Sequence, residues 1–198
     1  MDRMVFIGAL GARDAVVAQG VAANNLANAS TTGFRADLAR FQSEPLVGPG
    51  IDTRAFSTVA PTAVDLRSGA IETTGRPLDV AVEGEGFLAV LAADGSEAYT
   101  RAGDLRRGPG GMLVTGAGQP VLGEGGMIML PPVADVSIGA DGSISLSTPG
   151  QNGDVVAVID RLRLVNGPAD NWVKGADGLL RTADGEPAAL DAAVKLVP

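Results

Sequence analysis

The sequence predicts a mainly β protein with one N-terminal α-helix. We expect an antiparallel β-sandwich or distorted barrel domain, preceded by a long helix and an extended connector. The chain of 198 residues contains 28 Gly and 12 Pro but only 4% aromatic residues, which is a composition rich in turns. An Ala-rich stretch without Pro occupies residues 4–28, and alternating apolar residues begin near residue 78.

Residues 4–28 are predicted to form the helix. Its apolar side chains recur at spacings that keep them on one face, and Ile7 widens this stripe. The stripe consists of Phe6, Leu10, Val17 and Val21. Because the stripe is thin and Gly residues weaken the helix, we expect the helix to need a partner surface. A second layer against the chain's own β domain is the alternative.

The stretch "NNLANASTTGFRADL", residues 24–38, is predicted to end the helix. Asn, Ser and Thr side chains compete with the helical backbone for hydrogen bonds, and Gly33 suits a left-handed residue after the last turn. An ordinary helix stop does not explain Asn24, Asn25 and Asn28, which still lie within the helical register. We expect these amides to satisfy partners across an interface.

The remainder is predicted to be a connector followed by a β domain. Residues 31–65 show no sustained period, so we expect an extended connector with one short strand near residues 54–59. In residues 66–198, Leu78, Val80 and Val82 alternate with other residues before a Gly-rich turn and a second apolar run at 87–91. The predicted parts are therefore residues 1–30, 31–65 and 66–198.

Turn signals recur throughout the predicted β domain. Asp-Gly occurs at 94, 141, 177 and 184 and Asn-Gly at 152 and 166, all compatible with tight hairpin turns. The stretch "VSIGADGSISLS" predicts one hairpin. In a later strand, Leu162 and Leu164 alternate with arginines.

The composition excludes several classes of protein. The chain has no Cys and no His, which rules out thiol nucleophiles, Cys/His zinc sites and a Ser-His-Asp triad. Its net charge of −8 argues against nucleic acid or an anionic membrane as a partner. The N-terminal sequence lacks the basic region of a secretory signal, and no run approaches the ~20 apolar residues of a membrane span, so we expect no membrane insertion.

No catalytic, cofactor-binding or metal-binding residue is predicted. The clusters "GEGF", "GPGG" and "GAGQPVLGEGG" lack the complete glycine motifs of nucleotide-binding loops, and turns are the better interpretation. The stretches "AADGS" and "GADGS" offer too few spaced carboxylates for a calcium loop. A spatial pair of carboxylates stays open, but sugar clefts usually offer several aromatics and this chain has one Trp and one Tyr. We therefore expect no enzyme activity and no cofactor.

Two stretches resemble a known family, the bacterial flagellar rod and hook proteins. "ANNLANASTTGFR", residues 23–35, resembles the N-terminal signature of that family, and residues 76–126, beginning "RPLDVAVEGEGF", resemble the domain that follows it. The start "MDR" and the stretch "GFRADL" are most similar to its proximal-rod members. The resemblance implies a structural subunit of the basal-body rod that spans the periplasm. It also implies other rod subunits as partners and export by the flagellar type III apparatus without a cleaved signal.

The resemblance also implies roles for individual residues. Those implied at subunit interfaces are Phe6, Leu10, Val17, Val21, Asn24, Asn25, Leu26 and Asn28. Those implied as structural turn or core residues are Gly33, Gly84, Gly86, Phe87, Tyr99, Arg101 and Gly103.

One feature departs from the family pattern. Family members end with a second long helix that pairs with the first, whereas this sequence ends at "DAAVKLVP" after a strand-like run. We therefore expect residues 1–30 to be mobile, or to borrow a neighbouring molecule's surface by self-association or swapping. The alternative functions are a distal-rod or hook subunit and a periplasmic glycan-binding β-sandwich, whose ligand would alter the fluorescence of Trp172.

Overall fold

A computed structural model describes residues 2–45, 55–132, 135–148 and 155–198. They form two compact units: unit 1 comprises Met1–Thr31 and Arg35–Asp65, and unit 2 comprises Thr32–Phe34 and Leu66–Pro198. One N-terminal helix precedes many antiparallel strands in several small sheets, so the predicted class, mainly β with an N-terminal helix, is confirmed. The three predicted parts, with boundaries at residues 30 and 65, stay a prediction.

Unit 1 begins with a single long helix, α1 (Asp2–Ala27). Its bounds agree with the predicted 4–28 to within two residues, because an Ala-rich stretch without Pro sustains helical backbone. The helix ends where predicted: the Asn28 amide donates to the Asn24 carbonyl at 3.1 Å, and the Thr31 amide donates to the Asn28 carbonyl at 2.9 Å.

The rest of unit 1 is a β-hairpin of β1 (Asp37–Pro45) and β2 (Ala55–Val64). The strands pair antiparallel from Asp37 opposite Val64 to Pro45 opposite Ala55, with one register shift between Leu38 and Arg40. The prediction of a connector with one short strand is therefore wrong. Side chains of β1 are mostly exposed, so the strand lacks the alternation of buried and exposed residues from which strands are predicted.

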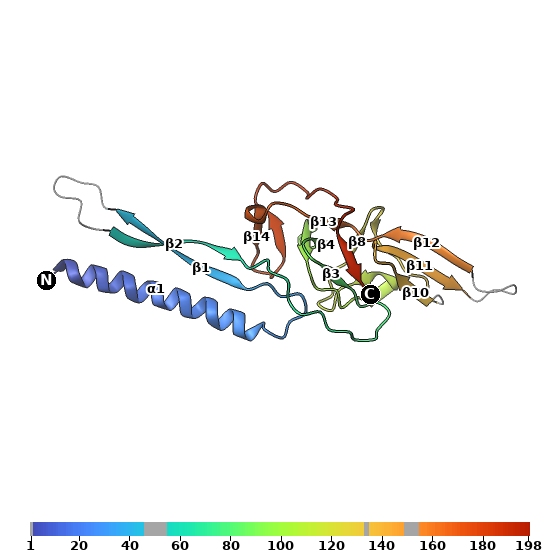
Figure 1. Ribbon diagram of the computed structural model, residues 1–198, viewed down its shortest axis with the longest axis horizontal. Helices are drawn as coiled ribbons and strands as arrows, with labels where there is room; N and C mark the ends of the chain where they lie inside the picture. Colours follow the sequence, from blue (N-terminus) through green and yellow to red (C-terminus); the bar gives the residue numbers. More distant parts are fainter. Residues whose placement is uncertain (1, 46–54, 133–134, 149–154) are drawn as a thin grey trace. The chain divides into compact units, whose positions relative to one another are not determined.

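The hairpin is the partner surface of the helix. α1 runs alongside β1 and β2 and contacts both strands (Figure 1). The helix therefore has a partner surface within the chain, from a hairpin that was not predicted. The expected mobility or self-association of residues 1–30 stays a prediction.

The described residues of unit 2 form five small sheets and two short 3-10 helices. The largest sheet has the strand order β13 (Leu164–Val165), β4 (Phe87–Leu91), β5 (Glu97–Thr100), β15 (Leu180–Thr182) and β14 (Trp172–Lys174). The three-stranded sheet has the order β10 (Asp135–Ile138), β11 (Ser143–Thr148) and β12 (Val155–Arg161). The two-stranded sheets pair β3 (Ala81–Glu83) with β16 (Lys195–Val197), β6 (Arg106–Arg107) with β7 (Leu113–Val114), and β8 (Leu122–Gly123) with β9 (Gly126–Met127). The 3-10 helices are η1 (Pro109–Gly111) and η2 (Ala169–Asn171).

One hydrophobic core joins these sheets. Val80 and Val82, predicted from their alternation, are buried in it, and Leu78 packs against it from the side. Leu88, Val90 and other core residues are fully excluded from solvent. Because the sheets are small, burial of apolar side chains in this shared core, rather than sheet size, holds unit 2 together.

The Asp-Gly pairs form four turns of one geometry. In each turn the Gly has a φ between 75° and 83°, at Gly95, Gly142, Gly178 and Gly185. The preceding Asp accepts a hydrogen bond from the backbone amide two residues further on, at 2.9–3.2 Å. The prediction of hairpin turns is confirmed at Asp94, Asp141 and Asp177, since Gly tolerates positive φ and Asp stabilises the turn locally. The Asp184–Gly185 turn has the same local geometry but follows β15 without forming a hairpin, because β15 does not pair with the next strand, β16.

The other turn predictions had mixed outcomes. The predicted hairpin "VSIGADGSISLS" is confirmed as β10 and β11. Asn152 lies outside the described residues. The Asn166–Gly167 pair connects β13 to η2 and forms no hairpin turn. In the Gly clusters, Gly110, Gly118 and Gly126 have positive φ, which agrees with the interpretation as turns.

Candidate assembly surface

The inner face of α1 is the one that lies against the hairpin. Leu10, Val17 and Val21 are half-buried, and Asp14 retains only 8% of its exposure. These residues, with Asn25, recur every three or four positions and so share one side of the helix. Three of the four residues of the predicted stripe are thus partly covered by the chain's own hairpin. The fourth, Phe6, is 65% exposed.

The opposite face of α1 is exposed and largely apolar. We call it the outer seam; it consists of Val5, Ala9, Ala12, Val16, Gln19, Ala23 and Leu26. Every one of these residues is exposed, and the three largest apolar side chains, Val5, Val16 and Leu26, are 69%, 67% and 79% exposed. Their spacing alternates between four and three residues, the pattern by which a helix presents one stripe to another helix. The sequence analysis predicted only Leu26 from this face, because apolar residues lie on both sides of the helix.

The amides at the end of α1 are used mainly within the chain. The Asn25 side chain donates to the Asp37 carbonyl and accepts from the Asp37 amide, both at 2.9 Å. The Asn28 side chain donates to the Asn24 carbonyl at 3.0 Å, which helps to close the helix. The side chain of Asn24 is exposed. The assignment of these residues to a subunit interface stays a prediction, but the Asn25 amide is already satisfied.

The length and composition of residues 5–27 would allow a membrane crossing, so the expectation that no run approaches a membrane span is wrong on that measure. These criteria are weak evidence for insertion. Arg13 and Asp14 form an ion pair of 3.0 Å near the middle of the helix, and placing them in hydrocarbon would be costly. The Ser57 side chain on β2, and then Arg13, lower the pKa of Asp14, which therefore stays charged beside the hairpin.

Residues Thr32–Phe34, in the loop after α1, form a short anchor within unit 2, the unit to which they belong. Gly33 has a φ of 70°, as predicted, and a Cβ there would lie 2.2 Å from the Arg101 carbonyl carbon. The Lys174 ammonium lies over the Phe34 ring, 4.1 Å from its centroid, in a cation–π contact. Sequence reasoning predicted the positive φ of Gly33 but neither contact, because both partners lie far away in the sequence.

Several of the predicted structural residues converge beside this anchor. Arg101 is buried, donates from Nε to the Gly86 carbonyl at 2.8 Å, and lies 5.1 Å from the centroid of the Phe87 ring. Trp172 packs against Phe87 and Tyr99 at centroid distances of 4.7 and 5.2 Å. Trp172 was not among the predicted structural residues, although as the one Trp of the chain it was a natural candidate for an aromatic core.

Tyr99 also connects distant parts of unit 2 through its hydroxyl. This oxygen accepts from the Ala188 amide at 2.7 Å and donates to Glu97 at 3.0 Å, and Glu97 in turn receives Arg163 at 3.0 Å. Burial, above all, raises the pKa of Tyr99. The hydroxyl therefore stays protonated and able to donate across the physiological range.

The predicted glycines have different structural reasons. Gly84 needs only its positive φ of 73°, because nothing lies near a Cβ built there. Gly86 combines a φ of 121° with the side chain of Val194, 2.6 Å from such a Cβ. Gly103 has ordinary φ, but a Cβ would lie 1.7 Å from the Val80 carbonyl oxygen, so close approach of two chain segments requires it.

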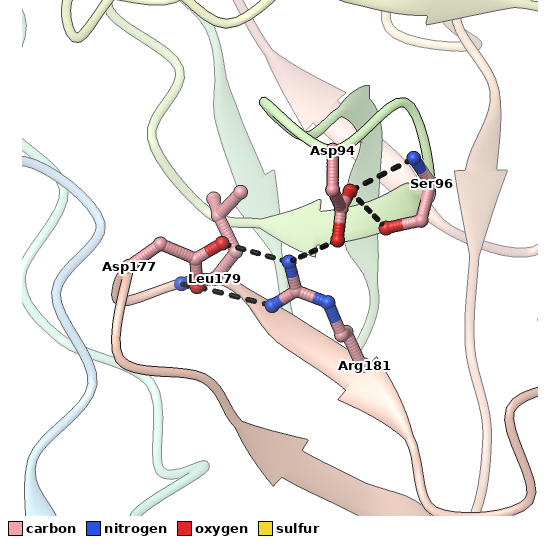
Figure 2. A network of polar contacts seen from close by, with 5 residues as sticks. All are labelled: Asp94, Ser96, Asp177, Leu179 and Arg181. Carbon is pink, nitrogen blue, oxygen red and sulfur yellow. Dashed lines mark hydrogen bonds and ion pairs between the residues drawn. The ribbon is translucent and has the colours of Figure 1, made fainter.

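Two of the Asp-Gly turns are linked by one arginine (Figure 2). Arg181 lies 2.8 Å from Asp177 and 3.7 Å from Asp94. The hydrogen bond from Arg181 is the main reason that the pKa of Asp177 lies below its usual value. The Ser96 hydroxyl and amide, and then Arg181, lower the pKa of Asp94. These carboxylates serve turn structure, and the described residues contain no group of acidic side chains placed to hold a metal ion.

Two stretches of the chain match models of known protein families. Residues 7–35 match the family described as "Flagella basal body rod protein", and residues 81–146 match the "Flagellar hook protein FlgE/F/G D1 domain". The chain is 42% identical to the flagellar basal-body rod protein FlgF of Salmonella typhimurium and to that of Escherichia coli, over 91% of this chain and 72% of each relative. It is 34% identical to FlgG of Bacillus subtilis, over 74% of this chain and 61% of the relative.

A long helix with an exposed apolar seam, followed by a β unit, is an architecture suited to a structural assembly protein, and the chain belongs to the flagellar basal-body rod protein family. It is a FlgF-like structural subunit of the rod. Membership implies assembly with other flagellar rod proteins, and a structural rather than an enzymatic role. The family resemblance and the absence of enzyme activity were both expected from the sequence.

Proposed function

We propose that α1 is the assembly helix of this rod subunit, and that its outer seam packs against α-helices of other rod subunits. The observation that carries the proposal is the asymmetry of the helix. Its inner face already has the hairpin as a partner, whereas Val5, Val16 and Leu26 on the outer seam stay mostly in solvent. A helix with apolar residues on both faces is suited to a position between two packing partners.

The chemistry of the outer seam favours a helix as the partner. Burying a Val or Leu side chain fully is worth about 1.5–3 kcal/mol, and the seam leaves three such side chains exposed. Ala9, Ala12 and Ala23 lie between them and allow a close approach of two helices. Gln19 is the one polar residue of the seam, and a single polar residue in such a stripe favours one register.

The rest of the proposed function follows from family membership. Unit 2 contributes to the outer wall of the rod and transmits torque through contact area, so that the protein acts by packing and not by chemistry. The subunit occupies the proximal rod, which the higher identity to FlgF than to FlgG supports. The flagellar type III apparatus exports it without removing a signal peptide, into the part of the rod that spans the periplasm.

The Val16→Asp substitution tests the outer seam. We expect the variant to be exported but not incorporated into rods, with loss of swimming, because a carboxylate would be buried in a helix contact. The matched control is Ile71→Asp, at a 49% exposed site in unit 2, which should assemble normally. Normal incorporation of Val16→Asp would contradict the proposal. Measuring secretion separately distinguishes an export defect from an assembly defect.

The glycan-binding alternative is not favoured. Trp172 is 6% exposed and both neighbouring aromatic rings pack against it, so it offers no open face on which a sugar ring could stack. The distal-rod and hook alternatives belong to the same family, and incorporation of the tagged subunit at a defined level of the rod would distinguish them.

A further inference from the structure

β12 is an exposed edge strand. It pairs with β11 on one side and forms the end of the three-stranded sheet (Figure 1). Val156 and Val158 are each 66% exposed, Ile159 is 40% exposed, and Ala157 between them is exposed as well. Both faces of the strand are therefore apolar and open to solvent.

The backbone edge of β12 is also open along this stretch. At its end, the Glu124 amide donates to the Arg161 carbonyl at 2.9 Å, and the Gly125 amide lies 3.4 Å from the Asp160 carboxylate. Within the described part of the chain, residues 156–159 have no backbone hydrogen bond to any element other than β11. An extended strand is the structure whose N–H and C=O groups match such an edge.

The other edge strands that the structure describes have features that oppose pairing with another chain. Strands β1, β3, β6, β10, β14 and β16 each contain a charged residue, β2 contains Pro61, and β7, β8, β9 and β13 have two residues each. Charges, prolines and short length are the usual protection of an edge against pairing with another chain. β12 has charged residues at its end, Asp160 and Arg161, and a register shift at Ile159. The stretch Val156–Val158 before them has no charge, Pro or bulge, which leaves it available to pair with a strand.

The sequence of the edge suits a second copy of the chain as its partner strand. Val156-Ala157-Val158 is the same in both directions, so two copies can pair antiparallel with Ala157 opposite Ala157 and Val156 opposite Val158. Pairs of β-branched residues across strands stabilise a sheet. We propose that β12 is a strand-addition site for a second copy of this chain, which joins the two three-stranded sheets into one continuous sheet.

This contact is independent of the outer seam of α1. A twofold strand pairing is closed at two copies and does not by itself extend into a rod. The dimer therefore belongs to the free subunit, and loss of the dimer leaves rod incorporation intact. Failure of this proposal is thus distinguishable from failure of the proposed function, which depends on Val16 and its neighbours.

Sedimentation of the full chain over a range of concentrations tests the proposal. We expect a monomer–dimer equilibrium whose dissociation constant rises about tenfold or more in Val158→Lys, because a charge on an edge strand opposes pairing. The matched control is Val173→Lys, at a 53% exposed position on the edge strand β14, which should dimerise like the unchanged chain. A chain that stays monomeric at every concentration, or an unchanged dimer in Val158→Lys, would overturn the proposal.

Disulfide formation tests the register. The chain has no Cys, so Ala157→Cys introduces a single thiol. Directly opposed residues on antiparallel strands have Cα atoms about 4.5–5.5 Å apart, within the range of a disulfide. Under mild oxidation by a copper–phenanthroline complex, we expect Ala157→Cys to form a covalent dimer much faster than Val173→Cys. Equal rates for the two variants would contradict the proposed pairing.

Discussion

The side-chain amide of Asn25 is hydrogen-bonded to both backbone groups of Asp37, as donor to the carbonyl and acceptor from the amide, each at 2.9 Å. This pair of bonds joins the last turn of α1 to the first residue of β1. A primary amide of this length supplies one donor and one acceptor at the spacing of a backbone. It therefore closes unit 1 where the chain reverses from helix to hairpin.

Replacing Asn25 should loosen the helix from the hairpin. We expect Asn25→Ala to destabilise unit 1 by about 1–3 kcal/mol, because both backbone groups of Asp37 lose a partner. Asn25→Asp should be at least as damaging, since a carboxylate cannot donate to the Asp37 carbonyl. Amide hydrogen exchange across α1 measures the effect. The control is Asn24→Ala, whose side chain is exposed; equal protection in Asn24→Ala and Asn25→Ala would contradict this account.

A comparison of two glycines separates backbone strain from close approach. Gly33 and Gly75 have nearly the same φ, 70° and 72°, but a Cβ meets the Arg101 backbone at Gly33 and nothing within 4 Å at Gly75. We expect Gly75→Ala to cost about 1–2 kcal/mol from the positive φ alone, and Gly33→Ala to cost more than about 3 kcal/mol. Denaturant unfolding followed by Trp172 fluorescence reports the difference. Similar losses in the two variants would show that the Gly33–Arg101 contact is not maintained in solution.

The Tyr99 hydroxyl should contribute measurably to the stability of unit 2. Tyr99→Phe keeps the ring in place but leaves the half-buried Ala188 amide without its 2.7 Å acceptor. We expect a loss of about 1–3 kcal/mol in the free energy of unfolding of unit 2. Ser68→Ala removes an exposed hydroxyl that donates over 3.4 Å, and should change stability by less than about 0.5 kcal/mol. If both variants were equally stable, the Tyr99 bond would contribute nothing.

The Arg181 network should make stability depend on pH on the acidic side. The pKa values of Asp94 and Asp177 are lower in the folded chain than their usual values near ~4. A lowered folded pKa contributes stability above the unfolded pKa, and this contribution is lost as pH falls through the folded value. We expect the free energy of unfolding to decline below about pH 4, and less steeply in Asp177→Asn. The exposed Asp170→Asn is the control, and a slope that is the same in both variants would contradict the prediction.

The elements predicted correctly depend on short-range chemistry. The Ala-rich stretch without Pro forms α1 within two residues of its predicted bounds. The four Asp-Gly turns form because positive φ and an Asp side-chain hydrogen bond are both satisfied within five residues. The hairpin of β1 and β2 was missed because its exposed side chains produce no alternation, and backbone pairing has no signature in the sequence.

By itself, the sequence determined the class of fold, the helix, the turns and the family, because each depends on residues close together in the chain or on a long shared motif. Only the tertiary structure decided which side of α1 is covered, since the hairpin partly buries Leu10 and Val17 and leaves Val16 and Leu26 in solvent. It also decided that Asn25 serves Asp37 and that Gly33 lies against Arg101. Each of these contacts joins residues that are separated in the sequence. A chain can bring such residues together in many arrangements, and tertiary packing selects one arrangement.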